Sequence, residues 1–99
     1  MSNYKVVGKK GEQIETDVLL HPGEILRDEL QAREIPQKEF AKKLGIQPPH
    51  LNDLLKGKRQ MSARLAVKIE KETGIDAAFW LRVQSAYQIS VIRKEFESA

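Results

Sequence analysis

The sequence predicts an all-α protein of five helices, preceded by a short extended arm. From His21 onward, apolar residues recur three and four positions apart, which is the spacing of one buried helix face. Prolines and glycines divide this region into five segments of helical length. Only residues 1–20 depart from the pattern, because their apolar and polar side chains alternate around the turn-forming stretch GKKG, which favours a β-hairpin.

The first two helices have clear starts and stops. Pro22 suits a first helical position, with acidic residues in the turn that follows, and His21 is expected to cap or pack that end. Pro36 ends the first helix. The second helix is expected from about Gln37 to Leu44, where Gly45 stops it as a C′ residue.

The same kinds of start and stop residues mark the remaining three helices. The stretch Gly45 to Arg59 contains a third predicted helix, which begins with two prolines. Proline is tolerated there because N–H groups in the first turn of a helix have no intrahelical partners. A fourth helix follows Ser62, a favoured N-cap, and stops at Gly74. The fifth begins near Ala77 and runs into a charged tail.

The composition is that of one small domain. The chain has 99 residues, of which 40% are hydrophobic and 31% charged, and a core of this size makes dimerisation a reasonable expectation. The absence of cysteine excludes disulfide scaffolds, cysteine zinc sites and thiol nucleophiles, and suits a reducing cytoplasm. No apolar run approaches the roughly 20 residues of a membrane span. We therefore expect a cytoplasmic protein with no membrane contact.

The second and third predicted helices form a helix-turn-helix, a pattern that DNA-binding domains and purely structural bundles share. Apolar residues mark the inner face of the third helix, at Leu51, Leu54 and Leu55. The opposite stripe consists of Pro49, Asn52, Asp53 and Lys56. In a major groove, asparagine pairs with adenine and aspartate accepts from the cytosine amino group. The alternative for each residue is an ordinary solvated surface.

Positive charge is concentrated around this unit. Between residues 37 and 59 there are six basic residues and two acidic ones, a local charge of +4 by difference, against +3 for the whole chain. A local basic surface is typical of a polyanion partner, although a solvated charged face is equally compatible with it. Lys58 and Arg59 follow the third helix in a loop and are expected to bind phosphates without reading sequence. Arg64 and Lys68 could extend that strip.

Three motifs in order, HPGEIL, LLKGKR and FWLRVQSAY, resemble the HigA antitoxins, or VapI group, of the λ-repressor-like helix-turn-helix proteins. The resemblance covers Leu20 to Ile92. It implies a five-helix DNA-binding domain at residues 21–92, between an arm at 1–20 and a tail at 93–99. It also implies a homodimer that represses its own operon through operator DNA and neutralises a HigB-like toxin, a ribosome-dependent mRNA endonuclease.

The resemblance also marks residues for DNA binding. Gln37, at the head of the second helix, resembles the family's backbone-anchoring glutamine. Pro48 and Pro49 stand where the family usually carries polar residues. Together with the stripe and the basic loop, the candidate DNA-binding residues are Gln37, Lys38, Gln47, Pro49, His50, Asn52, Asp53, Lys56, Lys58 and Arg59.

Two further surfaces are candidates for protein partners. Ile14, Thr16 and Val18 share one face of the arm, where an exposed strand could add to the edge of the toxin's sheet. Alternatively, the arm covers the first helix or pairs with the other subunit. The fifth helix carries more apolar residues than one core can use, so the candidate dimer contacts are Tyr87, Val91, Ile92 and Phe96.

The sequence offers no catalytic or metal-binding pattern. Two histidines without cysteine do not form a metal-ligand spacing, and no serine–histidine–carboxylate arrangement or glycine-rich phosphate loop is present. We therefore expect no enzyme activity, cofactor, metal or small-molecule substrate. Two alternatives remain: a helix-turn-helix regulator without a toxin, and a protein-interaction module that has lost DNA binding.

Overall fold

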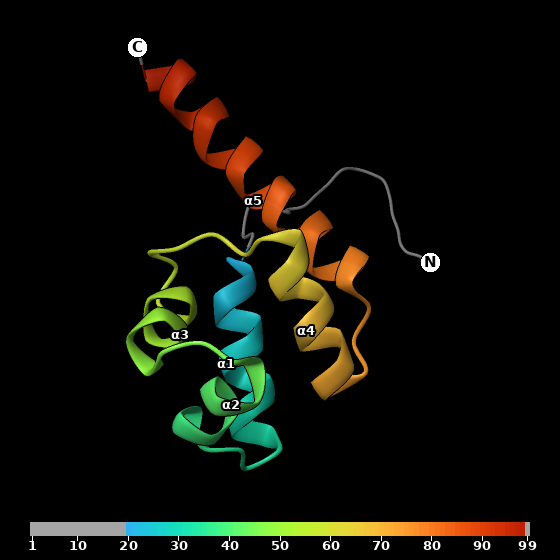
Figure 1. Cartoon of the computed structure of the whole chain (residues 1–99). Coiled ribbons are helices and arrows are strands. Elements are labelled where there is room, and N and C mark those ends of the chain that lie inside the picture. Colours follow the sequence, from blue (N-terminus) through green and yellow to red (C-terminus); the bar gives the residue numbers. More distant parts are fainter. Residues whose placement is uncertain (1–19, 99) are drawn as a thin grey trace.

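The computed structural model describes residues 20–98, which form five helices and contain no strand within that range (Figure 1). The helices are α1 (Pro22–Ala32), α2 (Gln37–Leu44), α3 (Pro48–Leu55), α4 (Ala63–Thr73) and α5 (Ala77–Ser98). The predicted all-α class is therefore confirmed. The arm, with its predicted hairpin, lies outside the described residues except for Leu20.

Local chemistry sets most of the helix boundaries where the sequence predicts them. His21 Nδ1 accepts a hydrogen bond of 2.9 Å from the Gly23 N–H at the start of α1. Ser62 caps α4, and its Oγ accepts from the Leu65 N–H at 3.1 Å. Gly45 ends α2 with a φ of 72°, a left-handed conformation that glycine adopts without steric cost.

Helix α1 ends earlier than the proline at position 36 predicts. Its last residue is Ala32, and the Ile35 N–H instead bonds to the Leu30 carbonyl at 2.9 Å. Glu34 takes the left-handed conformation, with a φ of 58°, which turns Ile35 toward the core. The α conformation is disfavoured for a residue before proline, so the chain leaves the helix before it reaches Pro36.

Helix α1 lies at the centre and packs against α3 and α5, while α4 packs against α2 and α5 (Figure 1). Trp80 and Phe40 are the largest fully buried side chains of the shared core. At the start of α1, a Cβ on Gly23 would collide with the Leu54 carbonyl oxygen. Because Gly23 has no side chain, α1 approaches the last turn of α3 backbone to backbone, and this contact sets the position of α3.

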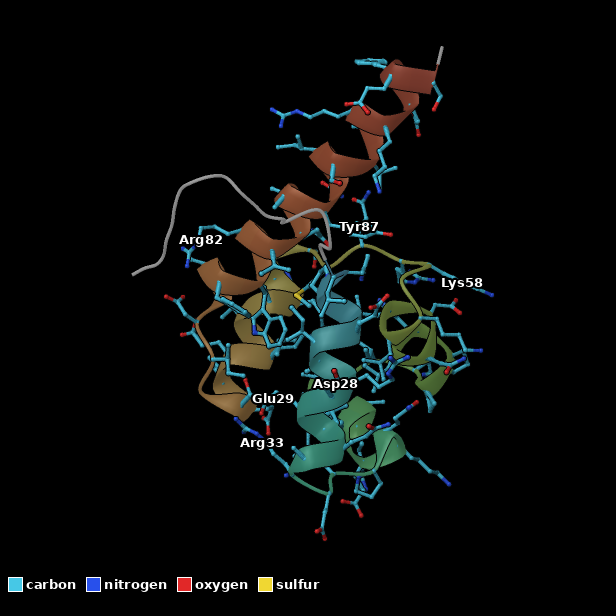
Figure 2. The ribbon with its side chains drawn as sticks, turned by 180° about the vertical axis from the view of Figure 1, so that it is seen from behind. Asp28, Glu29, Arg33, Lys58, Arg82 and Tyr87 are labelled. Atoms are coloured by element: carbon cyan, nitrogen blue, oxygen red, sulfur yellow. The ribbon has the colours of Figure 1, made fainter. Side chains whose placement is uncertain are left out.

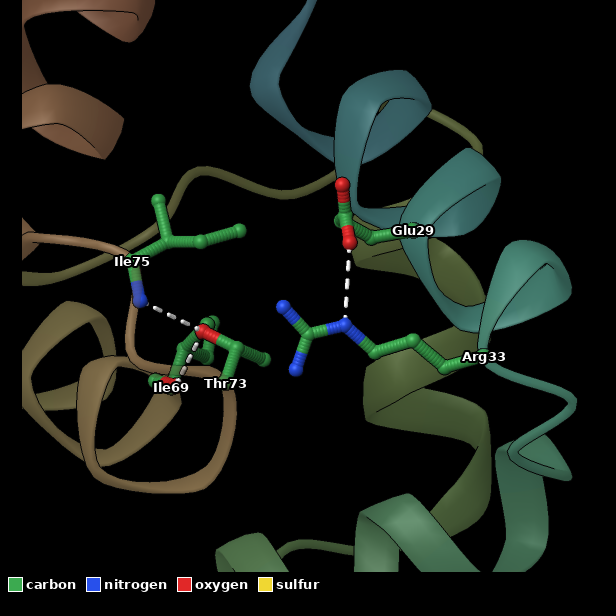
Figure 3. A network of polar contacts seen from close by, with 5 residues as sticks. All are labelled: Glu29, Arg33, Ile69, Thr73 and Ile75. Atoms are coloured by element: carbon green, nitrogen blue, oxygen red, sulfur yellow. Dashed lines mark hydrogen bonds and ion pairs between the residues drawn. The ribbon is translucent and has the colours of Figure 1, made fainter.

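Three polar contacts lie at the carboxyl-terminal ends of α4 and α1 (Figure 3). Thr73 Oγ1 donates to the Ile69 carbonyl at 2.8 Å and accepts from the Ile75 N–H at 3.1 Å, which stabilises the turn from α4 into α5. Glu29 and Arg33 form an exposed ion pair of 2.9 Å at the end of α1, of a kind that contributes little to stability in water.

Helix α5 extends beyond the body of the molecule (Figure 1). It continues through Ser98, so residues 93–98 of the expected charged tail are helical. Within residues 20–98, no helix combines the length and the apolar character that crossing a membrane requires.

Candidate nucleic-acid interface

Helix α3 turns the predicted stripe outward. Its apolar side chains are buried, with Leu51 and Leu54 fully inaccessible and Leu55 only 2% exposed. On the opposite face, Pro49 and Lys56 are exposed, and Asn52 and Asp53 are half-buried. The predicted orientation of α3 is therefore correct, and the polar stripe is accessible to a partner.

The first turn of α3 offers no unbonded backbone N–H. Pro48 and Pro49 are its first two residues and have no N–H to offer. The next two N–H groups, of His50 and Leu51, both donate to the Gln47 carbonyl, at 3.0 and 3.2 Å. The Gln47 side chain makes no cap hydrogen bond and is exposed. Within residues 48–51, any hydrogen bond to a partner must therefore come from a side chain.

A groove of about 480 Å³ lies where α2 and α3 begin. Its lining joins two residues of α2 to three of α3: Gln37, Lys38, Pro48, Pro49 and Asn52. Four of these five are candidate DNA-binding residues from the sequence, and Pro48 is added by the structure. The fold thus brings the heads of both helices of the helix-turn-helix to one surface.

A second groove, of about 300 Å³, lies between α3, the following loop and α4. Its polar lining is mainly basic, and it joins His50 and Arg59 to Arg64 and Lys68. Lys68 Nζ also donates to the Leu44 carbonyl at 3.2 Å, so this side chain satisfies the carboxyl end of α2. Arg64 remains available to extend the basic strip, whereas Lys68 has a structural hydrogen bond.

The loop after α3 projects its charges into solvent. Gly57 takes a φ of 78°, and the Lys58 N–H donates to the Asp53 carbonyl at 2.9 Å, which reverses the chain. Lys58 and Arg59 are both exposed, and Figure 2 shows Lys58 pointing away from the body. This arrangement suits the contact with phosphates that the sequence predicts for the loop.

A model of the helix-turn-helix family HTH_3 matches residues 26–80, which extend from α1 into α5. The chain belongs to this helix-turn-helix family. Antitoxin HigA of Pseudomonas aeruginosa, solved with the higBA promoter, is 32% identical and has a TM-score of 0.76; the match covers 82% of this chain and 89% of that one.

Two further proteins are similar to this chain over most of their length. An addiction module antidote protein of a HigA family from Coxiella burnetii is 33% identical, with 81% of this chain and 88% of that chain covered and a TM-score of 0.74. Virulence-associated protein I of Dichelobacter nodosus is 32% identical over 80 residues, which are 80% of this chain and 74% of the relative. The resemblance to the HigA antitoxins and the VapI group is confirmed.

In this helix-turn-helix chain, Gln84 of α5 holds the loop before α4 in place. Its Oε1 accepts from the Met61 N–H at 2.6 Å, and its Nε2 donates to the Met61 carbonyl at 2.8 Å. Gln84 is only 8% exposed. Sequence reasoning missed this residue, and the available signal was its position one turn after the buried Trp80, on the same face of the helix.

Three of the four candidate dimer residues lie on the projecting half of α5, whereas Tyr87 packs against the body. Tyr87 is half-buried and meets the His21 ring edge-on, with ring centroids 5.3 Å apart. The other three are exposed, Val91 by 38%, Ile92 by 47% and Phe96 by 76%. Ile89, which the sequence analysis did not select, is 48% exposed. The candidate toxin contacts Ile14, Thr16 and Val18 lie outside the described residues.

Proposed function

We propose that this chain is the antitoxin of a type II, HigB–HigA-like toxin–antitoxin system. It binds operator DNA as a dimer, represses its own operon and neutralises an mRNA-cleaving toxin. The observation that carries the proposal is the outward stripe of α3, in a fold like that of the HigA solved with promoter DNA. The antidote protein from Coxiella supports the toxin partner.

DNA recognition divides between base edges and phosphates. Asn52 and Asp53 supply the side-chain groups that read adenine and cytosine in the major groove. Gln47 and His50, at the start of α3, lie within reach of bases or phosphates. Five of the remaining candidates hold the backbone of the duplex and are Gln37, Lys38, Lys56, Lys58 and Arg59. The last candidate, Pro49, can offer only an apolar contact.

The test of sequence reading is the double substitution Asn52→Ala and Asp53→Ala. Each lost bidentate base contact should reduce operator affinity by about 1–3 kcal/mol, because the variant keeps its phosphate contacts but loses its hydrogen bonds to bases. Affinity for random duplex DNA should not fall, because the phosphate contacts stay and the removed Asp53 carboxylate has the same sign of charge as DNA. Competition titrations measure both affinities directly. An equal loss on random DNA would show that the stripe does not read sequence.

Toxin neutralisation is tested by expressing the toxin that the neighbouring reading frame would encode. We propose that Ile14, Thr16 and Val18 contact the toxin, because residues 1–20 carry balanced charge and have no electrostatic reason to bind phosphate. A variant that starts at Leu20 should still bind operator DNA but should fail to restore growth when the toxin is expressed. Full protection by that variant would place the toxin contact on the helical body instead. A locus without a toxin gene would indicate a regulator that acts alone.

The proposed activity is binding, without catalysis. We infer that the chain requires no cofactor, metal or small-molecule substrate, since operator binding and toxin neutralisation both rest on contacts between macromolecules. Operator DNA and an mRNA-cleaving toxin are both cytoplasmic partners, so we place the site of action in the cytoplasm.

A further inference from the structure

The paired prolines at the head of α3 form an exposed apolar surface beside polar groups. Pro48 and Pro49 are both exposed, and neither has a hydrogen-bonding side chain or an N–H. The next two N–H groups are already bonded to the Gln47 carbonyl. Residues 48–51 therefore have no free backbone N–H to donate to a base or a phosphate. The two prolines themselves can offer only van der Waals contact.

The groove beside the prolines suits an apolar group that is carried by a polyanion. Pro48 and Pro49 supply its apolar wall, and Gln37 and Asn52 contribute amide groups. Lys38 adds a positive charge, and none of the five lining residues is acidic. Proline rings have almost no side-chain entropy to lose, so this wall is ordered before any partner arrives.

In the major groove of B-form DNA, the edges of the bases carry donors, acceptors and one apolar group, the 5-methyl of thymine. We propose that Pro48 and Pro49 recognise the methyl group of one thymine in each operator half-site. This inference rests on the proposed function, because it requires α3 to lie in the major groove. Asn52, which lines the same groove, then reads the edge of an adjacent base.

Deoxyuridine provides a direct test with the unaltered protein. The probe is the duplex that full-length protein enriches from random-sequence DNA, and each thymine is replaced in turn by deoxyuridine. Uracil pairs as thymine does and lacks only the methyl group. One thymine per half-site should be sensitive, with affinity falling about fourfold, the factor equivalent to roughly 0.8 kcal/mol for one buried methyl group. The other thymines should show no change.

A variant assigns the effect to the prolines. In Pro48→Ser plus Pro49→Ser, affinity for the thymine and uracil duplexes should become equal at the sensitive position. Lys38→Ala is the matched control on the same groove: it should weaken binding to both duplexes and keep their fourfold ratio, because Lys38 contacts phosphate. Circular dichroism checks that each variant keeps the helical content of the parent.

The outcomes separate this inference from the proposed function. If the selection enriches no duplex, the result would contradict sequence-specific DNA binding itself. Enrichment of a duplex in which no thymine is sensitive to uracil would leave DNA binding intact and overturn methyl recognition. A sensitive thymine with the same fourfold penalty in the serine variant would show that other side chains contact the methyl group.

Discussion

His21 shows how one residue can serve several contacts at once. Its Nδ1 caps α1 by accepting from the Gly23 N–H at 2.9 Å, and its ring lies edge-on to Tyr87 of α5. A Cβ added to Gly57 would lie 3.5 Å from the same ring, so His21 also supports the turn that leads to the basic loop. Its side chain is 6% exposed. This residue therefore connects α1, α5 and the end of α3.

Burial lowers the pKa of His21 below its ordinary value of 6.5, although the carboxylate of Glu24 acts in the opposite direction. The unfolded chain then takes up a proton at a higher pH than the folded chain. The folded state is therefore favoured above pH 6.5, and this contribution is lost as the pH falls through the lowered pKa. A protonated ring also cannot accept the Gly23 hydrogen bond.

We expect the free energy of unfolding of the parent to fall as the pH drops below 6.5. His21→Asn should reduce that dependence, because asparagine can cap the helix and does not titrate. Urea unfolding between about pH 8 and pH 5 measures both proteins, across the range in which histidine ordinarily titrates. The control is His50→Asn, on the half-buried outer side of α3. Identical pH dependence in the His21 variant and the parent would contradict the assignment.

At the scale of elements, α3 and its following loop supply the two kinds of contact that we propose for DNA recognition. The apolar face of α3 is held by the core, and its Asn52 and Asp53 face outward. The loop is fixed at its far end, where Gln84 of α5 bonds both backbone groups of Met61. The proposed sequence reading and the proposed phosphate contact therefore belong to adjacent elements that are anchored independently.

Removing the two loop charges should weaken binding to operator and random DNA alike. For Lys58→Ala plus Arg59→Ala, the slope of log affinity against log salt concentration should decrease in magnitude by about 1.8, since each phosphate neutralised contributes about 0.9. Fluorescence anisotropy titrations over a range of salt concentrations measure that slope.

The matched control removes two charges elsewhere. Arg93 and Lys94 are exposed near the end of α5, away from the helix-turn-helix (Figure 1). Arg93→Ala plus Lys94→Ala should leave the slope unchanged. If the loop variant behaves like this control, Lys58 and Arg59 do not contact the DNA.

At the scale of the whole molecule, α5 carries apolar residues both inside and outside the core of the chain. Its first turns bury Trp80 and Gln84, whereas its second half projects from the body with exposed apolar side chains (Figure 1). Ile89, Ile92 and Phe96 follow one another at intervals of three and four residues and share one face of the helix. Apolar groups in such a row favour contact with a second helix.

We expect the dimer to depend on this row. Ile92→Glu plus Phe96→Glu should produce monomers, because each apolar side chain withdrawn from an interface costs about 1.5–3 kcal/mol. Operator binding should weaken in parallel, since one short recognition helix makes few contacts alone. Sedimentation velocity measures the oligomeric state, with Lys94→Glu, on the opposite face of the helix, as the control for an added negative charge. A persistent dimer in the double variant would place the interface elsewhere.

The sequence by itself determined where most helices begin and end, and which face of α3 turns outward. These features depend on neighbours within one or two turns: His21 and Ser62 cap the nearest N–H groups, Gly45 and Gly74 end helices, and apolar spacing marks the buried side. Even the place of the paired prolines at the start of α3 was predictable, because backbone N–H groups in a first helical turn have no intrahelical acceptors. The early end of α1 was not predicted, because Ile35 packs against a core that other helices build and the local sequence does not show that contact.

Only the tertiary structure decided which candidates meet. Gln84 and Met61 are 23 residues apart, and Lys68 and Leu44 are 24 apart, yet each pair is hydrogen-bonded. The groove at the heads of α2 and α3 likewise depends on the angle at which the two helices cross. Periodicity reports the face of a helix on which a residue lies. It carries no information about the residue from another helix that will lie opposite, because the packing of the shared core sets that pairing.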